Sequence, residues 1–100
     1  QPHLFSRTQD FMTDFAAVLS LFDRVLLLDI YPARELPIEG VSSGALKELI
    51  SGPSVELITK KELANRLSSV DERIIVLLGA GDIGLEVEGI KHKLLYDEAL

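Results

Sequence analysis

Apolar residues recur along this chain at two different spacings, which predict helices and strands in alternation. Residues 8–22 carry large apolar side chains three or four positions apart, and this spacing predicts an amphipathic helix. Residues 25–30 form a nearly unbroken apolar run of strand length, which is typical of a strand buried on both faces of a parallel sheet. Similar runs over residues 55–58 and 73–78 predict two further strands.

Three more helices are predicted between and after these strands. Ser42 or Ser43 caps a short one, and Thr59 with Glu62 forms the capping box that begins the next. A glycine-rich turn at residues 79–84 leads into the last helix. Because helices separate all three strands, the connections are crossovers, and we predict an α/β fold with a mostly parallel sheet and helices on both faces.

Size and composition limit the classes of function. One hundred residues make a single modest domain, and the absence of cysteine excludes disulfides and thiol catalysis. A net charge of −6 argues against nucleic acid and against an anionic membrane surface as partners. The apolar runs are too short to span a bilayer. We expect a cytoplasmic protein, and the missing initiator methionine suggests a piece of a longer chain.

The stretch Gln-Pro-His-Leu-Phe-Ser-Arg-Thr that opens the chain places polar side chains directly before the first helix. Free backbone N–H groups at a helix N-terminus favour anions. Arg7 could fork onto a carboxylate or phosphate, and His3 could hydrogen-bond or relay a proton. A purely structural role fits the same spacing, because Ser6 can open a capping box or Thr8 can cap the helix while the other two are solvated.

A second candidate site is the turn Gly-Ala-Gly-Asp-Ile-Gly at residues 79–84, which matches the spacing G-x-G-x-x-G after a predicted strand. In a dinucleotide site such glycines let a pyrophosphate approach the helix N-terminus, but an acidic residue should follow about 20 positions later, at the end of the next strand. No such strand is predicted here. The turn is otherwise a structural glycine turn in which Asp82 caps the helix, or a loop beside a polar substrate.

Three predicted strands make a thin sheet. A strand immediately before Gln1 would place the opening stretch at the carboxyl edge of the sheet, beside the loops at Tyr31 and Gly79. Open α/β sheets bind ligands at this edge. We therefore predict that such a strand precedes Gln1 and that the three polar loops share one rim.

Three motifs follow one another along the chain, namely Gln1-Pro2-His3-x-x-Ser6-Arg7-Thr8, Tyr31-Pro32-Ala33-x-Glu35-x-Pro37-Ile38 and Gly79-Ala80-Gly81-Asp82-Ile83. Together they resemble the C-terminal domain of the Mur ligase family of peptidoglycan synthesis, above all its alanine-adding branch. The resemblance implies that residues 1–100 are a three-layer Rossmann-like domain that brings the amino acid. It also implies that the domain's first strand and helix, the N-terminal UDP-sugar domain and the central ATP domain are absent from this chain.

The activity that the resemblance implies is an ATP-dependent amide ligation in cell wall biogenesis. The lactyl carboxylate of UDP-N-acetylmuramate would be phosphorylated to an acyl phosphate, which the amine of L-alanine then attacks. ATP and magnesium would be bound in the full-length enzyme, mostly by the absent domains. We therefore expect this chain alone to bind neither and to be inactive.

By resemblance, the substrate-binding residues lie in the first and third motifs. Arg7 would clamp the carboxylate of alanine, His3 would line the same side of the cleft, and Ser6 would support their loop. The glycine turn would lie close by, with the residues Gly79, Ala80, Gly81 and Asp82. Tyr31 and Glu35 would support these residues without contacting the substrate. The resemblance assigns no catalytic residue and no metal ligand to this chain.

Two positions depart from the family pattern. Leu4 stands where many relatives carry arginine, so Arg7 or an upstream residue must bind more of the substrate. Asp82 stands where many carry asparagine, and a carboxylate facing the site would repel that of the substrate. Two other classes of function remain open, a stand-alone nucleotide-binding module that uses the turn at Gly79 and a non-catalytic α/β interaction module. An exposed sheet edge would also invite pairing between copies.

Overall fold

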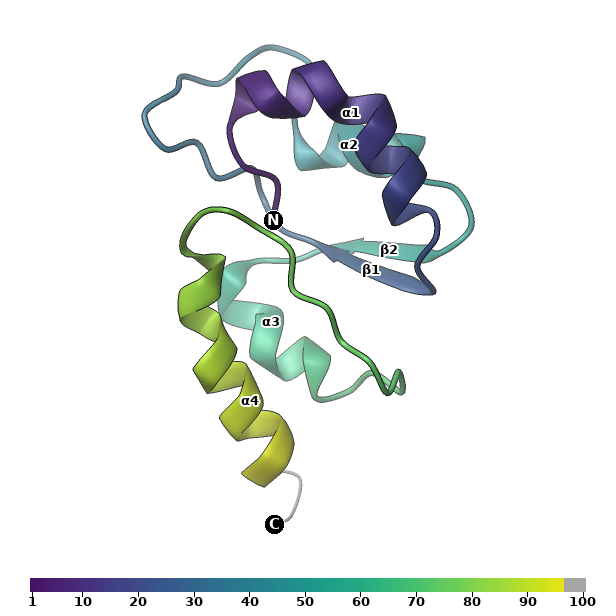
Figure 1. Ribbon diagram of the computed structural model, residues 1–100, viewed down its shortest axis with the longest axis vertical. Coiled ribbons are helices and arrows are strands. Elements are labelled where there is room, and N and C mark those ends of the chain that lie inside the picture. The colour runs from purple at the N-terminus through teal and green to yellow at the C-terminus, as the bar shows by residue number, and fades with distance from the viewer. Residues whose placement is uncertain (97–100) are drawn as a thin grey trace.

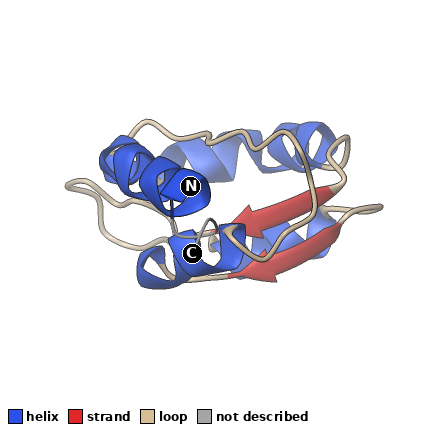
Figure 2. Cartoon of the chain, turned by 90° about the horizontal axis from the view of Figure 1, so that it is seen from below, coloured by secondary structure: helices blue, strands red, loops and turns tan. Residues whose placement is uncertain are grey.

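Two short parallel strands lie between two layers of helices in the computed structural model, which describes residues 1–96 (Figure 1, Figure 2). β1 (Arg24–Leu27) and β2 (Ser54–Leu57) pair in parallel, with Val25 opposite Val55. The helices are α1 (Phe5–Leu19), α2 (Ser43–Leu49), α3 (Lys60–Leu67), the 3₁₀ helix η1 (Asp82–Glu86) and α4 (Val87–Tyr96). The predicted α/β class with a parallel sheet is confirmed.

The sheet buries apolar side chains on both of its faces, with α1 and α2 over one and α3 and α4 over the other (Figure 1). Successive residues of a strand point to opposite faces. Val25 and Leu27 therefore join a buried cluster with Ala16 and Leu46, beneath α1 and α2. Leu28 joins the cluster on the other face, whose further buried members are Ile58, Leu63, Leu67, Ile83 and Ile90. This burial on both faces is what the apolar run of residues 25–30 predicted.

Residues 73–78 are not a strand in this structure, which corrects the prediction of a third strand. Their side chains still alternate, because Ile75 and Leu77 pack against the cluster beneath α3 and α4 while residues 74, 76 and 78 are exposed. A strand also needs a neighbouring backbone to complete its hydrogen bonds. Within residues 1–96 a groove separates this segment from β1, so the apolar pattern is present without the pairing.

α1 begins at Phe5, upstream of its predicted start, and neither predicted cap is formed. Leu4 occupies the N-cap position without a side-chain hydrogen bond. The fully buried Thr8 donates its hydroxyl to the Leu4 carbonyl oxygen at 2.8 Å. The capping roles predicted for Ser6 and Thr8 are therefore wrong, because the helix starts before both residues.

The other helix starts follow the sequence more closely. Ser42 caps α2 by accepting a hydrogen bond from the Ala45 N–H at 3.0 Å. Thr59 and Glu62 form the predicted capping box of α3. The predicted last helix is divided into η1 and α4, and residues 97–100, which the pattern assigned to the same helix, lie outside the described residues.

Candidate functional site

Three loops from distant parts of the sequence meet where the chain leaves β1. Tyr31 lies at their junction, because its N–H donates to the Pro2 carbonyl oxygen and its carbonyl oxygen accepts from the Leu4 N–H, both at 2.8 Å. His3 thereby forms a parallel bridge with Tyr31. The opening stretch of the chain thus continues the parallel pairing beyond the end of β1.

The ring of Tyr31 ties this opening stretch to the glycine turn. The rings of His3 and Tyr31 stack, with their centroids 5.5 Å apart and their planes inclined by 12°. From the other loop, a Cβ added at Gly81 would lie only 2.7 Å from Cγ of Tyr31, so the glycine backbone lies directly against the ring. The prediction that the loops at Gln1, Tyr31 and Gly79 share one rim is confirmed.

Glu35 makes a further connection, between the loop of residues 31–40 and the start of α1. One of its carboxylate oxygens accepts a hydrogen bond from the Ser6 N–H at 3.0 Å, and the other accepts from the Ser6 hydroxyl. These two bonds, the hydroxyl first and the N–H second, lower the pKa of Glu35 from its ordinary value. Ser6 therefore joins the start of α1 to the loop of residues 31–40.

Arg7, unlike Ser6, has no partner among residues 1–96. Its side chain is exposed and forms no hydrogen bond or ion pair with any residue of the described part of the chain. It lines a cavity of about 560 Å³ together with His3, Gly79 and Ala80, and most of the other side chains that line this cavity are apolar. Because a guanidinium is always charged and carries five donors, Arg7 is well placed at this rim to bind an anion.

Asp82 is paired with Lys60, the first residue of α3. Its carboxylate forms an ion pair with the Lys60 ammonium, at 2.5 Å. Asp82 is the first residue of η1, and the N-cap position is taken by Gly81, which has no side chain to accept a hydrogen bond from the helix. The capping role predicted for Asp82 is therefore wrong. Lys60 offsets the negative charge that would repel a substrate carboxylate. Sequence reasoning missed Lys60, since the two partners lie 22 positions apart and no local spacing links them.

The glycine turn does not fit a nucleotide phosphate. The space beside Gly79 is filled by the Ile83 side chain and that beside Gly81 by Tyr31, which keeps a pyrophosphate away from the backbone. Among residues 1–96, no group of three or more His, Cys, Asp or Glu side chains could hold a metal ion, and no helix is long and apolar enough to cross a membrane. The glycine turn therefore does not fit a pyrophosphate, and the dinucleotide interpretation loses its structural basis.

Relatives of known name match nearly the whole chain. The UDP-N-acetylmuramate–L-alanine ligase of Christiangramia forsetii is 57% identical over 97 residues, which are 97% of this chain and 22% of that protein. The chain thus matches a domain-sized part of this ligase. Ligases of the same name from Flavobacterium psychrophilum and Porphyromonas gingivalis are 56% and 48% identical, each over 94% of the chain and 21% of the relative. No protein-family model matches the chain.

The match to these UDP-N-acetylmuramate–L-alanine ligases confirms the resemblance seen in the three motifs. The chain spans only about a fifth of the length of these ligases. The same three motifs form the rim around Tyr31 in the structure. This chain thus gathers the three motifs at one end of its sheet.

Proposed function

We propose that this chain is the amino-acid-binding, C-terminal domain of a UDP-N-acetylmuramate–L-alanine ligase of the bacterial cytoplasm. The observation that carries the proposal is the 57% identity to one such ligase over 97 residues. The geometry supports it, because the three motifs meet at one rim where Arg7 has no partner among the described residues. The parent would join the amine of L-alanine to the lactyl carboxylate of UDP-N-acetylmuramate in peptidoglycan synthesis.

The contribution of this chain to that reaction would be binding. Arg7 offers paired N–H donors that match the two oxygens of the alanine carboxylate. His3, held by its stack on Tyr31, would form the neighbouring wall. ATP and magnesium would be bound by other domains of the parent, where they would supply the acyl phosphate. We expect the chain alone to be inactive, because it matches only about a fifth of the length of these ligases.

The test of this binding role is Arg7→Ala in the full-length parent. Loss of hydrogen bonds to a charged group costs about 1.5–3 kcal/mol, so KM for L-alanine should rise roughly 10- to 100-fold while KM for ATP stays unchanged. Arg7→Lys should recover only part of the loss, because an ammonium cannot form the fork. Arg73→Ala, at an exposed arginine outside the three motifs, is the matched control. Unchanged alanine kinetics in Arg7→Ala would remove Arg7 from the site.

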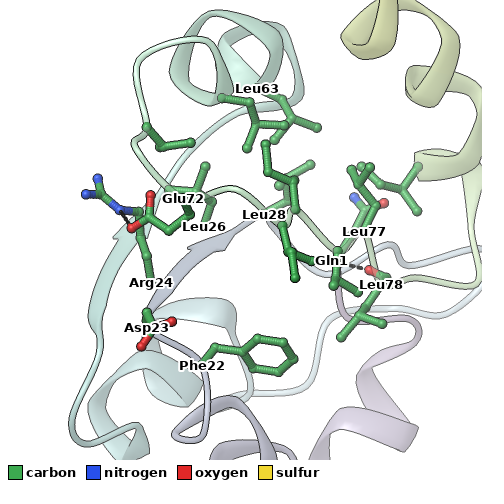
Figure 3. A pocket seen from close by; sticks show the side chains of 16 residues that line it. Gln1, Phe22, Asp23, Arg24, Leu26, Leu28, Leu63, Glu72, Leu77 and Leu78 are labelled. Atoms are coloured by element: carbon green, nitrogen blue, oxygen red, sulfur yellow. Dashed lines mark hydrogen bonds and ion pairs between the residues drawn. The ribbon is translucent and has the colours of Figure 1, made fainter. Parts of the chain in front are cut away.

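We also propose that the sheet of the parent contains a further strand in the groove between β1 and residues 74–78. Figure 3 shows Leu26 and Leu28 on one side of this groove and Leu77 and Leu78 across from them. A cavity of about 260 Å³ lies on the side of this groove that faces α3, and one of about 560 Å³ lies on the side that faces α1 and α2. A buried parallel strand typically lies in such an apolar space with helices on both sides.

Gln1 indicates where that strand would end. Its backbone nitrogen donates to the Leu78 carbonyl oxygen at 2.7 Å, and its side-chain amide donates to the Asp29 carbonyl oxygen at 3.1 Å. It therefore already bridges the two walls of the groove. Because His3 pairs with Tyr31 in parallel, residues preceding Gln1 in the parent would run beside β1 in the same direction.

The strand is tested by adding the roughly ten residues that precede Gln1 in the parent, a generous strand length. Amides of residues 74–78 should then become protected from hydrogen exchange, since they gain a ladder partner. Unchanged protection would refute the strand. If the exposed edge of β1 instead pairs with a second copy, the 100-residue chain should sediment as a dimer.

A further inference from the structure

The start of α1 has no cap of its own. Leu4 at the N-cap position has φ 70° and ψ 137°, and it supplies no side-chain hydrogen bond. The first turn of the helix contains no acidic residue either. A helix N-terminus leaves several N–H groups without intrahelical partners, and a carboxylate is the group that suits them best. Here that carboxylate comes from Glu35, 29 positions after the residue it binds.

A tight turn places Glu35 at this position. The Glu35 N–H donates to the Pro32 carbonyl oxygen at 2.9 Å, and Ala33 within the turn takes a left-handed conformation with φ 51°. Leu4, on the facing segment, is also left-handed, with φ 70°. Residues other than glycine hold such conformations only where surrounding contacts fix them. The two segments are thus fixed against each other at Tyr31 and again at Glu35.

The residues proposed to bind the substrate lie between these two points of attachment. His3 is stacked on Tyr31, and Arg7 directly follows the residue that Glu35 binds. We propose that Glu35 is a positioning residue, which caps α1 from the neighbouring loop and so sets the direction in which Arg7 leaves the first turn. This inference rests on the proposed function, in which Arg7 receives the carboxylate of the amino acid.

The cap also changes how an anion would be recognised at this rim. The sequence alone suggested that free N–H groups at the helix start would bind an anion. Glu35 already uses the Ser6 N–H and hydroxyl, and its negative charge lies at the helix N-terminus. A substrate carboxylate would therefore be bound by the Arg7 side chain and not by the backbone of α1. Glu35 would in this way enforce a single mode of carboxylate binding.

The first arm of the test is kinetic and uses the full-length parent. Wild-type enzyme must first show phosphate release that depends on L-alanine, since its absence would refute the proposed function before Glu35 is examined. Glu35→Ala should then raise KM for L-alanine about tenfold, with KM for ATP and kcat nearly unchanged. Glu35→Gln keeps an acceptor oxygen and should lie between wild type and Glu35→Ala. Glu39→Ala, at an exposed glutamate of the same loop, is the matched control and should behave as wild type.

The second arm is structural and does not depend on ligase activity. In the 100-residue chain, Glu35→Ala should speed hydrogen exchange of the Ser6 amide at least tenfold, while amides of β1 keep their protection. If Glu35→Ala leaves both the Ser6 amide and KM for L-alanine unchanged, the proposal is wrong. It is also overturned if Glu35→Ala raises KM for ATP as much as KM for L-alanine, because a positioning role predicts a selective change. Ser6→Ala, which deletes the hydroxyl donor alone, should show the same selectivity with a smaller effect.

Discussion

Gly81→Ala should disrupt the junction of the three loops, because it adds one methyl group where the structure has no room for it. The new Cβ would lie 2.7 and 2.8 Å from Cγ and Cδ1 of the Tyr31 ring, and ordinary contacts begin at 3.4 Å. The ring or the glycine turn must therefore move by about 0.7 Å. Tyr31 cannot move freely, since its backbone N–H and carbonyl oxygen form hydrogen bonds with the backbones of Pro2 and Leu4.

The cost of such overpacking is typically about 1–3 kcal/mol in the free energy of unfolding. For a domain of this size, each kcal/mol lowers Tm by roughly 4–8 °C. The matched control is Gly84→Ala, because a Cβ at that position meets nothing within 4 Å. That variant should keep or slightly raise Tm, since alanine reduces the freedom of the unfolded chain.

Thermal unfolding of the two variants and of the wild-type chain, followed by circular dichroism, gives the comparison directly. The same displacement should change the chemical shifts of the His3 ring protons, which lie in the field of the stacked Tyr31 ring. Gly81→Ala with the Tm of Gly84→Ala and unchanged His3 shifts would refute the account of the rim.

Three further predictions concern the core, the acid response and the ion pair at η1. Leu46→Ala, at a side chain 1% exposed, should lower the free energy of unfolding by about 2–5 kcal/mol in urea titrations, whereas Leu21→Ala, 84% exposed, should change it by less than about 0.5 kcal/mol. The hydrogen bonds from Ser6 lower the pKa of Glu35 in the folded state below its ordinary value of 4.5. The Glu35 carboxylate therefore stabilises the fold above pH 4.5, and this stabilisation is lost as the pH falls through the lower folded-state pKa. Glu35→Gln should flatten acid unfolding curves in this range. Asp82→Asn should cost at most about 1 kcal/mol, because its ion pair is partly exposed, and a larger loss on urea unfolding would show a role beyond that pair.

The sheet could be predicted from the sequence in part only. Residues 25–30 offer almost no polar position to solvent, so burial of β1 on both faces followed from the pattern alone. Residues 73–78 have the same apolar pattern and are not a strand. The pattern reports which side chains are buried, whereas a strand depends also on a neighbouring backbone, which the sequence of the segment does not specify.

The meeting of the three loops at one rim could be predicted from the sequence, but the contacts within the rim could not. Loops that follow parallel strands meet at one edge, so the meeting of three polar loops followed from the order of elements. The cap of α1 did not, because Ser6 and Thr8 are the residues that local spacing offers, while the acceptor is Glu35 from another loop. The pairing of Lys60 with Asp82 likewise links residues that only the tertiary structure brings together.

The most direct test of the proposed function is phosphate release with UDP-N-acetylmuramate, measured in parallel on the full-length parent and on this 100-residue chain. Reactions that lack either ATP or L-alanine, or that contain glycine or serine in place of L-alanine, are the controls. The account predicts release by the parent that requires both ATP and L-alanine, and none by the chain alone. Release by the chain alone would contradict the proposed division of labour, and a parent without alanine-dependent release would contradict the assignment itself.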